Sequence, residues 1–206
     1  MDIKAKIFLV ISIFLLQSNA GCKKKCFPMH YDFAIDTTFF YPELDSIAIG
    51  DTLFFRSETS NQLSNLADGK KIDYSNSPNF GAIIGFTELI GLNQTNGAVD
   101  DFTIIPNKGK IYTDSNVPSP TRVKQVIFAE ENRKYILSFA LIPNKKGIYS
   151  LGTGDMPSVI KNCDRSAISM NITNTNSHLH YLQDIYYGGG PISPLDLTHS
   201  YCFKVY

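Results

Sequence analysis

The amino-acid sequence predicts a mainly β protein, an antiparallel β-sandwich with one short helix near the C-terminus. Many short segments alternate apolar and polar residues, as strands with one buried face do. Phe and Tyr occur 14 and 11 times among 206 residues, and aromatic residues favour strands. Asn, Ser and Thr are also abundant, which is typical of a loop-rich β protein.

The first half of the chain shows strand patterns separated by turn residues. Residues 31–35 alternate, and residues 37–41 are rich in strand-forming types. Over residues 44–55 apolar positions keep a period of two on both sides of Gly50 and Asp51. We further expect a polar loop over residues 57–70 and strands over residues 71–74 and 80–90, the second of them central in its sheet. A turn is expected over residues 93–97.

The order of strand, Gly50-Asp51 corner and strand resembles the opening strands of immunoglobulin-like sandwich domains. This resemblance implies a fold of that kind. It implies no activity, because one fold supports many functions.

An internal similarity relates residues 102–112 to residues 139–149, at an offset of 37 positions. Each copy predicts a strand, a turn built around Pro, Asn, Lys and Gly, and a second strand. Two interpretations stay open, a duplicated hairpin and independent use of the same turn chemistry. The second copy carries Gly147 and Tyr149, which resemble the tyrosine corner of immunoglobulin-like domains.

The second half predicts three more strands and the helix. The strands are expected over residues 122–129, 166–173 and 201–206. The helix is expected over residues 177–188, with Ser177 as N-cap and Gly188 as its end. Its buried stripe contains Leu179, Leu182, Ile185 and Tyr186.

The N-terminal segment predicts export. Lys4 and Lys6 precede a run of ten residues, 7–16, that is apolar except for Ser12. Ten helical residues reach about half of the hydrocarbon core of a bilayer, so the run is the core of a signal peptide. Residues 19–22, Asn-Ala-Gly-Cys, resemble the lipobox of bacterial lipoproteins, in which the cysteine is acylated. The resemblance implies a signal peptide over 1–21, a lipidated tether over 22–30 and a single domain over 31–206.

Other lipid-anchored proteins also begin with Cys followed by a lysine run, as Lys23 to Lys25 do here. The alternative is ordinary cleavage after Ala20, with Ser18 and Ala20 as the pair of small residues. Three lysines just past such a site oppose translocation. The usual lipobox has Leu where this chain has Asn19.

The expected pairing of the four cysteines depends on whether Cys22 carries lipid. An exported chain enters an oxidising space, where paired thiols form disulfides. With Cys22 lipidated, Cys163 and Cys202 are the expected pair, and Cys26 is left over. Without lipid all four can pair, and Cys22 then closes a small loop with Cys26.

Charge argues against a nucleic-acid partner. Residues 1–25 hold five of the 19 basic residues and one of the 19 acidic residues, Asp2. Residues 26–206 therefore contain 14 basic and 18 acidic residues, a net charge of −4. A nucleic-acid binder carries a basic surface instead.

Motifs for catalysis or cofactors are not found in the sequence. Neither a Gly-x-Ser-x-Gly nor a His-Glu-x-x-His signature occurs, and no Cys-x-x-Cys pair suggests a metal site. His178 and His180 share a face on a strand but not on the expected helix, so we predict surface or packing histidines. A metal-assisted hydrolase using His178, His180 and Asp184 is the competing hypothesis.

Two further groups of residues are candidates for contact or modification. Tyr181, Tyr186 and Tyr187 lie beside a run of three glycines and are candidates for partner contact, or for burial on the inner face of the helix. Thr37, Ser46 and Thr52 each sit in an Asp-Ser/Thr-x tripeptide. These tripeptides resemble those that some Gram-negative bacteria O-glycosylate, and they also fit ordinary strand and turn residues.

These observations predict a lipoprotein of the bacterial outer membrane, attached to the bilayer by lipid on Cys22. We expect a non-catalytic binding or accessory module with a protein or glycan partner and no cofactor. The alternatives are the hydrolase above and a structural subunit of an outer-membrane assembly.

Overall fold

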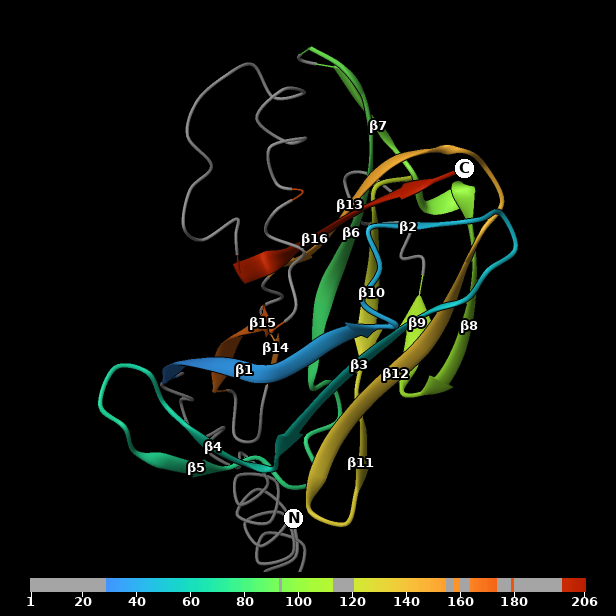
Figure 1. Cartoon of the computed structure of the whole chain (residues 1–206). Coiled ribbons are helices and arrows are strands. Elements are labelled where there is room, and N and C mark those ends of the chain that lie inside the picture. The colour runs from blue at the N-terminus through green and yellow to red at the C-terminus, as the bar shows by residue number, and fades with distance from the viewer. Residues whose placement is uncertain are drawn as a thin grey trace, which may run out of the picture.

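The structure is a computed structural model that describes residues 29–92, 94–112, 121–154, 158–159, 164–173, 179 and 198–206. These residues form two seven-stranded sheets and a separate two-stranded pair, shown in Figure 1. The prediction of a mainly β sandwich is confirmed. Within the described residues, no helix combines the length and the apolar character needed to cross a membrane.

The first sheet has β12 as its most widely paired strand, because β12 contacts β3 on one side and both β11 and β8 on the other. From one edge to the other its strands are β14 (Ser158–Val159), β15 (Arg165–Ile172), β1 (His30–Tyr41), β3 (Leu53–Ser60), β12 (Lys134–Pro143), and then β11 (Ala129–Glu131) with β8 (Phe102–Lys108).

The second sheet has β6 near its centre, as the apolar run over residues 80–90 predicted. Its strands in order are β2 (Ser46–Ile47), β16 (Ser200–Val205), β13 (Gly147–Gly154), β6 (Gly81–Gly91), β10 (Val123–Ile127) and β9 (Lys110–Tyr112), and β7 (Gln94–Gly97) also pairs with β6. The separate pair is β4 (Gln62–Ser64) with β5 (Lys71–Asp73), and the 3-10 helix η1 (Val99–Asp101) precedes β8.

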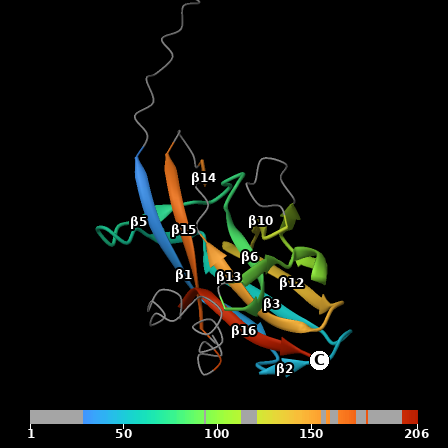
Figure 2. The same ribbon diagram turned by 90° about the horizontal axis from the view of Figure 1, so that it is seen from above.

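The expectation of purely antiparallel sheets is wrong. β1 pairs with β15 in parallel, and β2 pairs with β16 in parallel. Figure 2 shows β1 and β15 side by side. Both pairs join the start of the chain to its end, so no tight turn forces the two strands into opposite directions.

Two predicted loops contain strands. Residues 57–70 include the end of β3 and all of β4, and residues 93–97 include β7. These segments are polar because their outer faces meet solvent, which hides the strand pattern. Except for Leu179, the predicted helix over 177–188 lies outside the described residues, so it is unsupported.

The core lies between the two sheets and is rich in aromatic rings. The inward positions of β12, namely Tyr135, Leu137, Phe139 and Leu141, are at most 1% exposed. Phe40 of β1 connects the sheets, because its ring centroid lies 5.1 Å from that of Phe55 and 4.7 Å from that of Tyr201 on β16. Aromatic pairs at such distances add about 0.5–1.5 kcal/mol each beyond their buried area.

The two copies of the internal similarity are not hairpins. The first copy runs from β8 in one sheet to β9 in the other, and the second runs from β12 to β13 in the same way. The leading strands pair with each other instead, with Phe102 opposite Pro143 and Phe139 opposite Pro106. Each copy is therefore a crossing between the sheets. In the second copy β12 ends at Pro143, whereas in the first β8 continues through Pro106 to Lys108.

The second crossing contains the predicted tyrosine corner. The hydroxyl of Tyr149 lies 3.1 Å from the carbonyl oxygen of Lys145 and 3.1 Å from Asp101 Oδ2, two acceptors for its proton. Its ring covers Gly147, where a Cβ atom would lie 2.9 Å from Tyr149 Cζ. Burial, followed by the charge of Asp101, raises the pKa of Tyr149, so the phenol stays protonated.

The first crossing passes close to another chain segment that also changes sheet. β10 continues after Phe128 as β11, so this segment leaves the second sheet for the first. Gly109, between β8 and β9, has φ +82°, and a Cβ atom there would lie 2.5 Å from Ile127 O and 2.9 Å from Leu137 Cδ1. Only glycine fits both the dihedral and the space.

Replacing Gly109 with Ala tests this close approach. A left-handed backbone costs alanine about 1–2 kcal/mol, and forcing an extra methyl group into a packed site costs about 1–3 kcal/mol more. Gly50→Ala is the matched control, because Gly50 has φ +87° and no atom within 4 Å of the added Cβ. Urea unfolding should give a clearly larger loss of free energy for Gly109→Ala, and equal losses would contradict the contact.

Candidate functional site

Most of the site residues predicted from the sequence lie outside the described part of the chain. These are the lipidation site Cys22, the disulfide partner Cys163, the tyrosines Tyr181, Tyr186 and Tyr187, and His178, His180 and Asp184 of the competing hydrolase. Their roles stay predictions. Among the described residues, no group of three or more His, Cys, Asp or Glu side chains suits a metal ion.

The remaining predicted residues have defined positions. Cys202 is buried on β16 and packs in a small cluster with Leu89 and Leu179. Its disulfide with Cys163 stays a prediction. Thr37 on β1 and Ser46 on β2 are exposed, and Thr52 before β3 is partly exposed. A modifying enzyme can therefore approach the hydroxyls of Thr37 and Ser46, and their glycosylation stays a prediction.

The outer face of the first sheet carries a row of apolar side chains across four strands. Tyr41, Phe54, Ala140 and Ile105 are register neighbours on β1, β3, β12 and β8. Tyr41 and Phe54 stack with ring centroids 5.0 Å apart and are 42% and 38% exposed. Adjacent exposed apolar residues of this kind are typical of contact surfaces.

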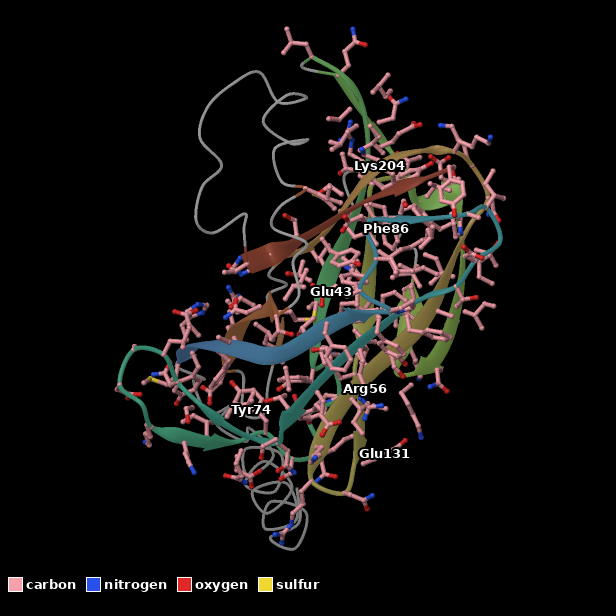
Figure 3. The ribbon with its side chains drawn as sticks, viewed as in Figure 1. Glu43, Arg56, Tyr74, Phe86, Glu131 and Lys204 are labelled. Atoms are coloured by element: carbon pink, nitrogen blue, oxygen red, sulfur yellow. The ribbon has the colours of Figure 1, made fainter. Side chains whose placement is uncertain are left out.

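A polar pocket of about 650 Å³ lies at the end of the sandwich where β11 turns into β12. Three chain segments form it, namely the link between β3 and β4, the loop after β5 and the β11–β12 turn. Figure 3 shows Glu131 close to this turn and Tyr74 close to the β4–β5 pair. All eight side chains that line the pocket are polar or charged.

Asn61 joins the three segments of the pocket. Its backbone N–H donates to Arg133 O at 2.9 Å, and its carbonyl oxygen accepts from the Tyr74 N–H at 2.8 Å. Its side-chain Nδ2 donates to Glu130 Oε1 at 2.9 Å. Asn61 is only 5% exposed, so these bonds are shielded from water and hold the segments together.

Glu130 is fixed between two of these segments. Its Oε1 accepts from Asn61, and its Oε2 accepts from the backbone N–H of Asn76 at 2.6 Å. The hydroxyl of Tyr135 lies 3.4 Å from the same Oε2 and donates to Tyr74 O at 2.7 Å. Burial raises the pKa of Tyr135 to about 12, so its hydroxyl remains a donor. The carboxylate therefore has a set position before any ligand arrives.

The backbone of the pocket is unusual. The described residues include three non-glycine positions with positive φ, and all three line this pocket. Asn76 has φ +60°, Asn132 has φ +50° and Arg133 has φ +65°. Asn tolerates this region, whereas Arg does so at a cost of about 1–2 kcal/mol. Strained residues of this kind cluster at functional sites.

Sequence reasoning missed this pocket. Residues 57–70 were expected to be a loop, and the strand predicted over 122–129 ended before Glu130. The turn signal was weak, because a two-residue hairpin turn normally has Gly second and this one has Arg133 after Asn132. The apolar run over residues 135–141, interrupted only by Ser138, was a usable sign of the strand that follows.

Comparisons with known proteins assign no family. No family model matches the chain, and no curated protein matches it in sequence. Among solved structures, a cohesin module from a family 33 glycoside hydrolase of Clostridium perfringens shares 11% identity at a TM-score of 0.31, covering 66% of this chain and 98% of the module. The CupB6 tip adhesin of Pseudomonas aeruginosa shares 14% identity at a TM-score of 0.22, covering 71% of this chain and 42% of the adhesin. Likenesses of this size carry no function to the chain.

Substitution of Glu130 by Gln tests how the pocket is held. The amide has one acceptor oxygen, so either the Asn61 side chain or the Asn76 N–H would face an amide NH₂ group. An unsatisfied donor of this kind costs about 1–3 kcal/mol. Glu131→Gln is the control, because Glu131 makes a half-exposed ion pair with Lys108, and such pairs contribute at most about 1 kcal/mol. Urea unfolding should show the larger loss for Glu130→Gln, and the reverse order would contradict this account.

Proposed function

We propose that this protein is an exported lipoprotein, attached by lipid on Cys22 to the bacterial outer membrane, whose domain is a non-catalytic binding module for a protein or glycan partner at the cell envelope. The observation that carries the binding role is the polar pocket between Asn61, Asn76 and Arg133. The lipid anchor rests on the N-terminal sequence.

The anchor would keep the domain close to the membrane. β1 begins at His30, eight positions after Cys22. Eight residues span at most about 28 Å even when fully extended. A domain on so short a tether samples only ligands near the bilayer surface, which suits an envelope component better than a diffusing one.

The pocket supports binding because its walls are fixed without a ligand. The side-chain amide of Asn61 donates to the carboxylate of Glu130, and the segments that these residues join adjoin strands of the sandwich. A site that is already ordered loses less entropy when a ligand binds. Preorganised polar groups on rigid strand ends are a common basis for recognition.

The non-catalytic part of the proposal rests on the sequence. Neither a Gly-x-Ser-x-Gly nor a His-Glu-x-x-His signature occurs in the chain. His178 and His180 of the competing hydrolase are two positions apart, and on a helix this spacing places them on different faces, where they do not chelate one metal ion together. The pocket contributes carboxylates that are engaged by neighbouring donors, as expected for a fixed binding wall.

The anchor is tested with Cys22→Ser. Cells that produce the full-length protein and are fed labelled palmitate should label the wild type and not this variant. The variant should also leave the membrane fraction. Cys26→Ser is the matched control and should keep both label and membrane attachment. Label on Cys22→Ser would exclude the proposed anchor.

The binding role is tested with Gln62→Ala. Gln62 lines the pocket, is exposed and has no side-chain hydrogen bond in the described part of the chain, so its loss should not unfold the domain. We expect a member of a panel of neutral oligosaccharides, acidic oligosaccharides and short peptides to bind the wild type. Loss of one hydrogen bond weakens binding about fivefold.

Ser64→Ala is the control for that experiment, because Ser64 lies two residues further on β4, is also exposed and does not line the pocket. Titration calorimetry should give equal dissociation constants for Ser64→Ala and the wild type. Absence of binding to every member of the panel, or equal losses in the two variants, would refute a binding role for the pocket.

A further inference from the structure

The side chains of the pocket divide into a fixed set and an unengaged set. Asn61, Glu130 and Asp73 hydrogen-bond to their neighbours, and Asp73 Oδ1 accepts from both the N–H and the hydroxyl of Ser75. Within the described residues, the side chains of Gln62, Asn76, Asn132 and Arg133 have no such partner. The unengaged set therefore offers amides and a guanidinium to a ligand.

The charges of the pocket disfavour an anion. Asp73 and Glu130 are carboxylates and Arg133 is the one cation in the lining, which leaves one net negative charge. A phosphate or carboxylate ligand would be attracted by one group and repelled by two. A ligand without charge avoids this repulsion and still finds hydrogen-bond partners of both kinds.

The lack of apolar residues in the lining disfavours a peptide. Protein and peptide contacts are centred on buried aromatic or aliphatic anchors, and the pocket offers no apolar side chain to receive one. A hydroxyl group both donates and accepts. Guanidinium groups donate through a planar fork, amides both donate and accept, and carboxylates accept, so neighbouring hydroxyls of a sugar match this lining well.

The turn that presents Arg133 is not explained by folding. A two-residue turn with positive φ at both positions joins β11 to β12, and Asn-Gly is the favoured sequence for such a turn. Arg at the second position strains the backbone. Strained positions cluster at functional sites, and this one lines the pocket.

We propose that the pocket binds an uncharged saccharide and that Arg133 is the residue that determines this specificity. The inference rests on the proposed binding function and names the ligand class. Asn76 and Asn132 line the same pocket as Arg133, so amide and guanidinium groups can together hold adjacent hydroxyls of one sugar ring. An ionised carboxylate has about four lone-pair sites, so Asp73 and Glu130 can accept from the same ring in addition to their neighbours.

The probes are neutral disaccharides of glucose, galactose, mannose and N-acetylglucosamine, titrated into the full-length protein in detergent and followed by calorimetry. A ligand of this size held mainly by hydrogen bonds should have a dissociation constant of about 1 mM. At least one probe is expected to bind. Matched glucuronic-acid disaccharides and short peptides should bind at least about tenfold more weakly.

Arg133→Gly separates binding from folding. Relief of the strained backbone should raise the Tm by about 2–4 °C, while loss of the guanidinium weakens saccharide binding about tenfold. Arg133→Lys keeps the charge and the strain but loses the planar fork, so its binding should fall without a gain in Tm. Lys146→Ser is the control, because Lys146 is exposed in the β12–β13 turn and is not part of the pocket lining.

Three results would overturn the inference. Unchanged saccharide binding by Arg133→Gly would remove the role of Arg133. Binding of peptides or acidic saccharides in preference to neutral ones would exclude the ligand class while leaving the binding function intact. Binding of no probe in the wider panel would refute both the inference and the proposed function.

Discussion

The structure depends on the close approach of two backbones where the chain passes from one sheet to the other. Gly109 lies against the carbonyl oxygen of Ile127, at the point where β8 gives way to β9 and β10 to β11. Phe128 then packs on Phe80 with ring centroids 5.2 Å apart, and Phe80 stacks on Tyr135 at 4.0 Å. Since β11 begins directly after Phe128, this corner sets the position of Glu130 and with it one wall of the pocket.

The pocket is built from backbone as much as from side chains. Asn61 connects three segments through its N–H, its carbonyl oxygen and its amide, and each connection satisfies a group that would otherwise be buried without a partner. A buried polar network is stable only when all of its members are satisfied. The side chains of Asn76, Asn132 and Arg133 can therefore stay unengaged, because the framework does not need them.

The sequence predicted strands well and their partners poorly. Alternation over residues 47–55 identified strands, because a half-buried strand imposes a period of two wherever it lies. The same pattern says nothing about which strand lies beside it. A duplicated hairpin therefore stayed open for the two crossings, and the parallel pairs of β1 and β2 were not expected. The pocket combines Asn61, Asn76 and Glu130, which are 15 to 69 positions apart along the chain. Local patterns do not report such contacts.

Charge links the anchor to the pocket. Lys23, Lys24 and Lys25 follow Cys22 directly, whereas residues 26–206 carry a net charge of −4. If Cys22 carries lipid, an anionic membrane surface attracts the lysines at about 1 kcal/mol each and repels the domain within about 10 Å. The tether would then lie on the surface while the domain stands off it. With two carboxylates and one guanidinium in its lining, the pocket has no net attraction for the anionic headgroups of such a surface.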